Sequence, residues 1–139
     1  MSFDEFISKY SGRFVNYDGK YGYQCVDLIR QYCKEVIGVE GYTAIPQTGA
    51  AKSIFNNFPN AGNKYFTKIL NSPTNAPQKG DIVFWGTYLF VTGWAGHTGV
   101  CSESNVMNFI SFDQNYPTGQ PCKFVKHSYK GVLGWLTPK

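Results

Sequence analysis

Apolar residues recur with two different periods along this chain, and the change between them divides it into two parts. In the first part, residues 3–10 and the segment from Val26 to Ile37 carry apolar side chains three and four positions apart, which predicts two helices. Gly38 is suited to end the second helix. A weaker helical pattern covers Thr48–Phe58.

The second part begins at Gly80, where short apolar runs alternate with turn residues in the manner of β-strands. The polar stretch before it, up to Pro77, predicts mostly loop. Helices followed by an antiparallel sheet are typical of an α+β domain. The expected strands are Asp81–Trp85, Gly96–Cys101, Val106–Phe112, Cys122–His127 and Val132–Leu136.

Length and composition fit one folded domain over residues 1–139, because 42% of the residues are hydrophobic. The sequence holds no apolar run long enough to cross a membrane, and its first residues lack the basic-then-apolar pattern of a signal peptide. We therefore expect a monomer that is made in a cytoplasm without a signal peptide and that has no membrane partner. A net charge of +4 without a run of Lys or Arg argues against a nucleic-acid partner.

Cys25 is the most informative residue, because it lies where the second predicted helix begins. The positive end of the helix dipole favours a thiolate there, and the thiolate is the nucleophilic form of cysteine. The alternative is a small buried apolar residue, which describes most free cysteines. Cys33 fits that alternative, since it lies on the core face of the same helix. The four cysteines form no CxxC pair, so we expect free thiols.

A nucleophilic thiol needs a base, and the chain has only two histidines. His127 lies among lysines, where we expect a solvated surface position. His97 lies in a strand-like segment before the turn Ser102–Asn105, so the strands on either side of this turn should form a hairpin. The hairpin places His97 opposite residues 110–112 and diagonal to Asp113, whose carboxylate would then hold the imidazole.

The strand that contains Asp113 ends in Asp113-Gln114-Asn115, whose first and third side chains should share one face. Either Asp113 or Asn115 could therefore orient His97, and the residues leave both assignments open. His97 and Asp113 also have ordinary explanations, the first as a core histidine bonded to a backbone carbonyl and the second as the cap of a turn.

Five segments, taken in order along the chain, carry a more specific signal. They are Tyr23-Gln24-Cys25-Val26-Asp27-Leu28, Gly80-Asp81-Ile82-Val83-Phe84-Trp85, Gly96-His97-Thr98-Gly99-Val100, Asp113-Gln114-Asn115-Tyr116 and Gly134-Trp135-Leu136. Together they resemble the CHAP domain, the cysteine, histidine-dependent amidohydrolase/peptidase family of phage lysins and bacterial wall hydrolases. The resemblance runs from about residue 12 to the end. It implies a papain-like α+β fold, with N-terminal helices packed on an antiparallel sheet.

The resemblance implies that Cys25 is the nucleophile and His97 the general base. Asp113 and Asn115 match the acidic and amide positions of the family's Glu-Gln-Asn segment, although aspartate is one methylene shorter than glutamate. Gln24 and backbone N–H groups near Cys25 are candidates for the oxyanion hole.

The implied function is hydrolysis of an amide bond in bacterial peptidoglycan, by an N-acetylmuramoyl-L-alanine amidase or by an endopeptidase of the stem peptide or cross-bridge. Trp94 is the candidate wall of the substrate groove. Within the family, the lack of a signal peptide favours a phage lysin over a secreted autolysin. One alternative is an amidase of a small molecule such as a glutathione–polyamine conjugate. The other is a wall-binding module without activity, which has no reason to keep Cys25, His97 and Asp113.

The loop before Cys25 has the ligand spacing of an EF-hand-type calcium site. Several phage CHAP domains, which this chain resembles, bind calcium at the matching loop. The alternative is an ordinary turn whose last residue is favoured by the helix dipole. Zinc sites built from His97 with Cys101, or from Cys122 with His127, lack the tight CxxC spacing. The calcium candidates, at positions 1, 3, 5, 7 and 12 of the loop, are Asn16, Asp18, Lys20, Gly22 and Asp27.

Overall fold

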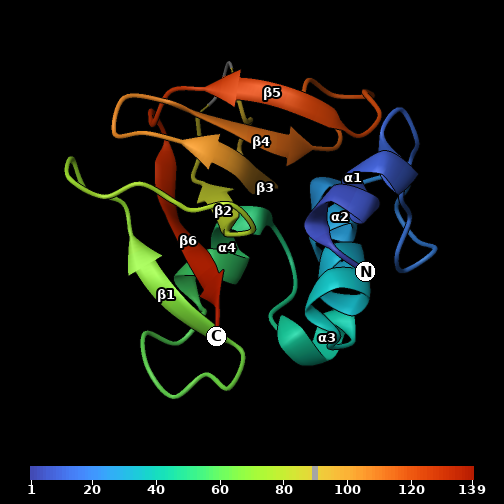
Figure 1. The fold of residues 1–139 in the computed structure, drawn as a ribbon, viewed down its shortest axis with the longest axis horizontal. Coiled ribbons are helices and arrows are strands. Elements are labelled where there is room, and N and C mark those ends of the chain that lie inside the picture. Colours follow the sequence, from blue (N-terminus) through green and yellow to red (C-terminus); the bar gives the residue numbers. More distant parts are fainter. Residues whose placement is uncertain (89–90) are drawn as a thin grey trace.

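The computed structural model describes residues 1–88 and 91–139, and it confirms the α+β class (Figure 1). The helix predicted over residues 3–10 is confirmed, and Gly38 ends the next helical segment in a left-handed conformation with φ 86°. The third predicted helix, Thr48–Phe58, is shorter than expected. The observed helices are α1 (Phe3–Tyr10), α2 (Cys25–Tyr32), its π-helical continuation η1 (Cys33–Ile37), α3 (Gly41–Ala44) and α4 (Ala51–Asn56).

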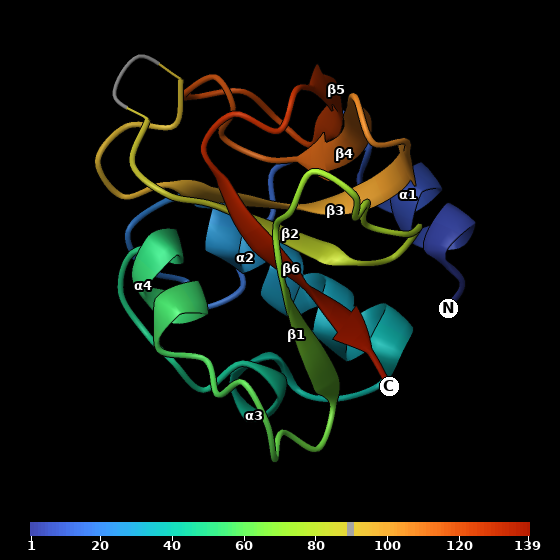
Figure 2. The same cartoon turned by 90° about the vertical axis from the view of Figure 1, so that its left-hand side faces the viewer.

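The described strands form one antiparallel sheet in the order β1-β6-β2-β3-β4-β5. The last strand of the chain, β6, lies between β1 and β2, as Figure 2 shows. The prediction of loop up to Pro77 was wrong at β1, which pairs with the end of β6 at the sheet edge. The strands are β1 (Phe66–Leu70), β2 (Ile82–Trp85), β3 (His97–Ser104), β4 (Phe109–Asp113), β5 (Lys123–His127) and β6 (Val132–Pro138).

Buried residues form two apolar clusters, because successive strand residues point to opposite faces of the sheet. Ile82 and Phe84 of β2 pack with helical residues such as Leu28 in the larger cluster. Val83 and Trp85, which alternate with them, belong to a second cluster on the other face of the sheet. Both faces of the central strand are therefore buried, and α2 and α4 are held against one of them.

The hairpin of β3 and β4 is longer than the sequence predicted. β3 continues to Ser104, and the turn is closed by Asn105, whose Oδ1 accepts the N–H groups of Met107 and Asn108. As a result Asp113 lies opposite Gly99, and His97 lies beyond the paired residues of β4 instead of opposite residues 110–112 as expected. The diagonal relation of His97 and Asp113 is nevertheless confirmed, because Gly99 is two residues from His97.

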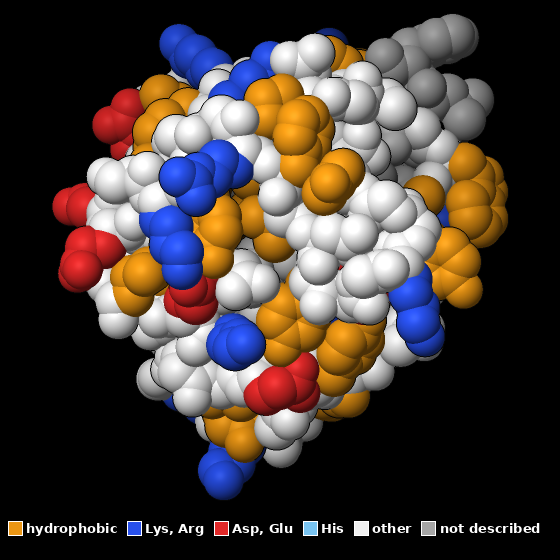
Figure 3. All heavy atoms as spheres, turned by 90° about the vertical axis from the view of Figure 1, so that its right-hand side faces the viewer, with side chains coloured by type: hydrophobic (Ala, Val, Ile, Leu, Met, Phe, Trp, Pro, Cys, Tyr) orange, Lys and Arg blue, Asp and Glu red, His pale blue; other side chains and the backbone are white. Residues whose placement is uncertain are grey.

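Charged side chains of both signs are interspersed on the face that carries α1 and α2 (Figure 3). In residues 1–88 and 91–139, the helices are all too short or too polar to cross a bilayer.

Candidate active site

Cys25 is the first residue of α2, as predicted, and its side chain is half-buried. Its position is fixed from both directions along the chain. Gln24 precedes the helix in an extended conformation, and its N–H donates to Oδ2 of Asp27 at 2.9 Å. The N–H groups of a helix's first turn have no partner within the helix. Cys25 therefore presents its thiol at the positive end of the helix dipole, two residues before Asp27, whose N–H donates to the carbonyl oxygen of Gln24 at 3.1 Å.

Gln114 attaches this helix start to the sheet, and sequence reasoning assigned it no role. Its buried amide donates through Nε2 to the carbonyl oxygens of Val15 and Gln24, each at 2.8 Å. Its Oε1 accepts the N–H of Val15 at 2.6 Å and the thiol of Cys122 at 3.4 Å. The signal was present in the Asp113-Gln114-Asn115 segment, whose middle residue points to the opposite face from Asp113 and so toward α2.

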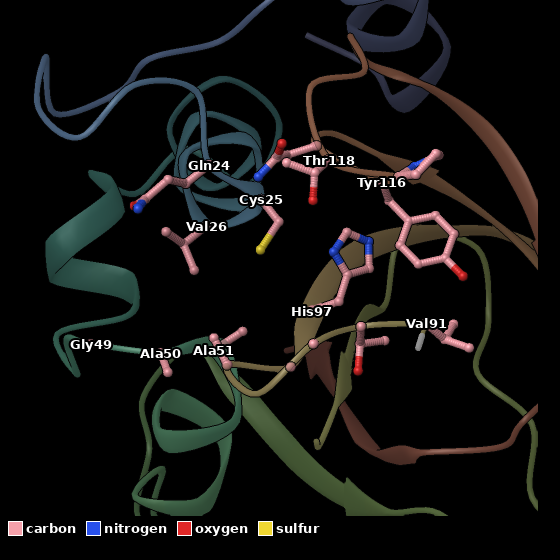
Figure 4. A pocket seen from close by; sticks show the side chains of 16 residues that line it. Gln24, Cys25, Val26, Gly49, Ala50, Ala51, Val91, His97, Tyr116 and Thr118 are labelled. Carbon is pink, nitrogen blue, oxygen red and sulfur yellow. The ribbon is translucent and has the colours of Figure 1, made fainter. Parts of the chain in front are cut away.

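His97 begins β3, directly across the cleft from the thiol, and Figure 4 shows a nitrogen of its ring facing the Cys25 sulfur. Nε2 of His97 lies 3.6 Å from Oδ1 of Asp113, with the histidine 3% exposed and the aspartate fully buried. Cys25, His97 and Asp113 are thus brought together as the sequence predicted. Gly99 permits the approach, because a Cβ there would lie 2.0 Å from Oδ1 of Asp113.

The buried pair of His97 and Asp113 perturbs both titrations. Burial is the largest single effect and would lower the pKa of His97, but the interactions with Asp113 and with Cys25 together exceed it and raise the pKa above the ordinary value. Burial alone would raise the pKa of Asp113, but the charge of His97 and a hydrogen bond from His127 lower it. Near neutral pH the arrangement therefore favours an ionised carboxylate beside a protonated imidazole.

The expectation that His127 is a solvated surface residue was wrong. His127 ends β5, is 7% exposed, and its Nε2 lies 2.6 Å from Oδ2 of Asp113. The neighbouring Lys126 is exposed because alternation along β5 sends adjacent side chains to opposite faces. The adjacent Lys126 therefore lies on one face of the strand, and the histidine lies on the other.

An open cleft of about 450 Å³ exposes the thiol and the imidazole. Its walls come from the start of α2, the segment before α4, the loop before β3 and the loop after β4, as Figure 4 shows. Near the two reactive groups these walls consist of small residues such as Ala50 and Gly96. A peptide-like substrate therefore has room to lie across Cys25.

Three predicted site residues are placed differently from the reactive pair. Asn115 lines the cleft, but it has a left-handed φ of 62° and its Oδ1 accepts the N–H of Gly119 at 2.7 Å, so the same-face argument fails there. Gln24 also lines the cleft, and Figure 4 shows its amide directed away from the Cys25 sulfur. Trp94 is 68% exposed and is not among the described residues that line the cleft. Its ring stacks under Nζ of Lys52 at 3.8 Å.

The other thiols are separated from Cys25 by burial. All four cysteines are free, as expected. Cys33, Cys101 and Cys122 are fully buried, and burial raises the pKa of each to about 12. They remain protonated at neutral pH, and Cys33 packs in the core as the sequence predicted.

The predicted calcium loop supplies two carboxylates. Asp27 is buried, and burial raises its pKa, to which the charge of Asp18 adds. Oδ1 of Asp18 accepts the N–H of Lys20 at 2.8 Å, while Asn16 and Gly22 are exposed. Tyr21, at the loop position where glycine is usual, has a left-handed φ of 58°.

Side chains outside the predicted calcium loop do not form a metal site in the described residues. Across residues 1–88 and 91–139, no group of three or more His, Cys, Asp or Glu side chains is arranged to hold a metal ion. In particular, His127 uses its Nε2 on Asp113, whereas the thiol of Cys122 bonds to Gln114. The loop predicted to bind calcium thus has only two carboxylates, Asp18 and Asp27. Backbone carbonyls and Asn16 would have to supply the remaining oxygen ligands.

The fold and the Cys–His–Asp arrangement define a papain-like α+β protein, and comparison with known proteins identifies its family. The chain belongs to the CHAP domain family, whose model matches residues 15–115. It is 28% identical over 134 residues to endolysin PlyTW of Staphylococcus phage Twort, in a match covering 89% of this chain and 27% of that endolysin.

Two solved structures are similar to this chain in fold. The wild-type endolysin LysIME-EF1 is 26% identical, with a TM-score of 0.74 over 99% of this chain and 64% of that one. The structure of Ly7917 shares the fold, with a TM-score of 0.64 and 18% identity over 99% of this chain and 63% of that one. The chain thus spans about a quarter of the curated endolysin and less than two thirds of these structures.

Proposed function

We propose that this chain hydrolyses an amide bond of bacterial peptidoglycan, with Cys25 as the nucleophile. The observation that carries the proposal is the thiol at the start of α2, which faces a buried imidazole across an open cleft, with the carboxylate of Asp113 behind that imidazole. A thiol, a base and a group that orients the base are the parts that cysteine-dependent acyl transfer requires. Similarity to two endolysins directs the proposal to the cell wall.

The chemistry follows from the geometry. His97 holds the proton that the Cys25 thiol gives up, and the thiolate attacks the carbonyl carbon of the amide to form a tetrahedral intermediate. The backbone N–H of Cys25, at the start of α2, stabilises the developing oxyanion. His97 then gives its proton to the leaving amine as the C–N bond breaks. A water that His97 deprotonates attacks the resulting thioester, releases the carboxylic acid and restores the thiol.

The two candidate reactions differ only in the bond that is cut. An N-acetylmuramoyl-L-alanine amidase releases the stem peptide from the lactyl group, whereas an endopeptidase cuts within the stem peptide or the cross-bridge. Both use the same steps at Cys25 and His97. Mass spectrometry of digested wall fragments distinguishes them, because the new N-terminus identifies the bond. We also propose that the chain is the catalytic part of a phage lysin that reaches the wall from the host cell.

The decisive test replaces the nucleophile. We expect Cys25→Ala to abolish the clearing of purified cell walls, measured as loss of turbidity, while its melting temperature and its pull-down on walls stay unchanged. His97→Ala should do the same. Cys101→Ala is the matched control, since its buried, protonated thiol takes no part in the reaction.

Retained lysis in Cys25→Ala would end the proposed mechanism. If the unmodified protein leaves walls intact but releases the amine of a glutathione–polyamine conjugate, the small-molecule amidase is the correct reading. If it binds walls and cleaves neither substrate, it is a binding module.

We propose in addition that the loop from Asn16 to Asp27 binds calcium. Burial raises the pKa of Asp27 and the charge of Asp18 adds to the rise, so a cation bound beside Asp27 would offset both effects. The left-handed Tyr21 gives the loop the sharp turn that such a site needs at this position. Calcium would tie the loop to the first turn of α2, two residues after Cys25.

A further inference from the structure

The carboxylate of Asp113 has closer contacts with Ser111 and His127 than with His97, the histidine that lines the cleft. Oγ of Ser111 donates to its Oδ1 at 2.6 Å, and Nε2 of His127 lies 2.6 Å from its Oδ2. By contrast, Nε2 of His97 lies 3.6 Å from Oδ1, beyond hydrogen-bond range, and is a buried nitrogen without a hydrogen-bond partner among the described residues. The orientation of Asp113 is thus set by residues other than the histidine it serves.

His127 itself is closed off from the substrate. Its ring packs against Trp85, Phe109 and Tyr116, with centroid distances of 4.7, 5.4 and 5.0 Å. Trp85 and Tyr116 also contact the ring of His97, at 5.0 and 4.9 Å. Only His97 of the two histidines is among the described residues that line the cleft. His127 is therefore excluded as a base for the substrate, although it shares the carboxylate and two aromatic neighbours of the base.

We propose that His127 is a positioning residue for catalysis, which donates from Nε2–H to Oδ2 of Asp113 and so directs Oδ1 toward His97. The proposal rests on the proposed function, in which His97 acts on Cys25. An aspartate reaches one methylene less far than a glutamate, so its carboxylate has to be turned to face the imidazole. One donor on each oxygen fixes that rotation, and burial makes a lost donor costly.

A purely structural role for His127 makes a different prediction. If the ring only filled space between Trp85 and Tyr116, an aromatic ring without a donor would replace it. If its donor matters, a side chain that places an N–H at the same reach would replace it instead. Glutamine does so, because its Nε2 is as many bonds from Cα as Nε2 of histidine.

The experiment compares His127→Phe with His127→Gln in wall lysis over a range of substrate concentrations that yields both kcat and KM. We expect His127→Phe to lower kcat roughly ten- to hundredfold with KM within twofold, because misplacing a catalytic group by about 1 Å can cost on the order of 100-fold. His127→Gln should recover kcat to within a few-fold of the unmodified protein. Lys126→Phe, on the exposed face of the same strand, is the matched control and should leave kcat unchanged.

A second measurement does not depend on activity. The chain has two histidines, so ¹⁵N-labelled imidazole in either His127 variant reports on His97 alone. We expect the ring signals of His97 in His127→Gln to match those of the unmodified protein and those in His127→Phe to shift. If His127→Phe fails to fold, His127→Met takes its place, since methionine matches glutamine in length and has no donor.

The outcomes are separable. Equal kcat and equal His97 signals in His127→Phe and the unmodified protein would overturn the positioning role. Equal losses in the Phe and Gln variants would overturn it too, because the donor would then be irrelevant. Neither result touches the proposed function, which fails only if Cys25→Ala still clears walls. If the proposed function fails while the His97 signals respond to the donor, the contact to Asp113 is established without its catalytic consequence.

Discussion

Gly99 has no side chain, and its absence allows Asp113 to approach His97. Asp113 lies opposite Gly99 on the neighbouring strand, and its carboxylate crosses over the bare Cα of that glycine to approach His97. A Cβ at Gly99 would meet both Oδ1 of Asp113 at 2.0 Å and the carbonyl oxygen of Phe112 at 3.0 Å. The spacing of histidine and glycine in Gly96-His97-Thr98-Gly99 therefore has a steric reason.

The charge of Asp113 should be visible in the pH dependence of activity. It raises the pKa of His97 above the ordinary 6.5, so the imidazole keeps its proton at neutral pH and releases it only as the pH rises through the raised value. We expect the alkaline limb of kcat/KM to lie well above pH 6.5 and to move toward lower pH in Asp113→Asn, with a large loss of rate. The measurement is the full pH profile of both proteins. Asp4→Asn, at an exposed position, is the control, and an unmoved limb in Asp113→Asn would contradict the assignment.

The reactive residues were predictable where local sequence determines their surroundings. Cys25 is recognised by the helix that follows it, and His97 by the hairpin that brings it to Asp113. His127 was not predictable, because its surroundings come from β4 and from Trp85, not from the lysines beside it in sequence. The prediction that Asn115 shares a face with Asp113 was wrong. The strand ends at Asp113 and the backbone of Asn115 is left-handed, which strand alternation does not anticipate.

At the scale of elements, the strand that the sequence missed lies at the edge of the sheet. Only Phe66 of β1 is buried, and the four residues after it are exposed or half-buried without alternating. Lys68 is directed to the carbonyl oxygen of Phe58, to which its Nζ donates at 2.8 Å. β1 forms because the edge of β6 offers unpaired backbone groups, and that edge exists only after β6 has joined the sheet.

The join between β4 and α2 depends on one side chain. Replacing Gln114 with leucine leaves both backbone groups of Val15 and the carbonyl of Gln24 without their partner in a buried region. We expect Gln114→Leu to lower the free energy of unfolding by about 2–4 kcal/mol, since unsatisfied buried polar groups cost roughly 1–3 kcal/mol each and partial relaxation offsets some of the loss. Denaturant midpoints measure the change.

Exposed Gln120 provides the control for that substitution. Its Oε1 meets only Nζ of Lys123, at 3.4 Å, so Gln120→Leu should change the free energy of unfolding by no more than about 0.5 kcal/mol. Equal stability of the two variants would show that the amide of Gln114 does not hold the helix start in place. Because Gln24 precedes Cys25, we also expect Gln114→Leu to lyse walls more slowly than the control.

Over the whole molecule, the site is assembled from segments that are far apart in sequence. The bond from Gln114 to Gln24 joins residues 90 positions apart, and the bond from Gln114 to Val15 joins residues 99 apart. The helices carry the nucleophile and the sheet carries the base and its carboxylate, so the site exists only when the two layers are packed. Sequence patterns predict the layers, whereas the side chains that connect them are set by the packing.

Calcium, if it binds the loop from Asn16 to Asp27, should stabilise the whole domain, because ligand that binds only the folded state adds to its stability. At a concentration 100 times its Kd that gain is about 2.7 kcal/mol, which for a domain of this size corresponds to a rise in melting temperature of roughly 5–10 °C. We expect chelator to lower the melting temperature of the unmodified protein and to leave that of Asp18→Ala unchanged.

Asp18 also bonds the N–H of Lys20, so the comparison is between responses to calcium and not between absolute melting temperatures. Asp4→Ala is the matched control and should respond as the unmodified protein does, since Asp4 lies in α1 outside the loop. A melting temperature that is the same with calcium and with chelator would show that the loop is an ordinary turn whose two carboxylates need no cation.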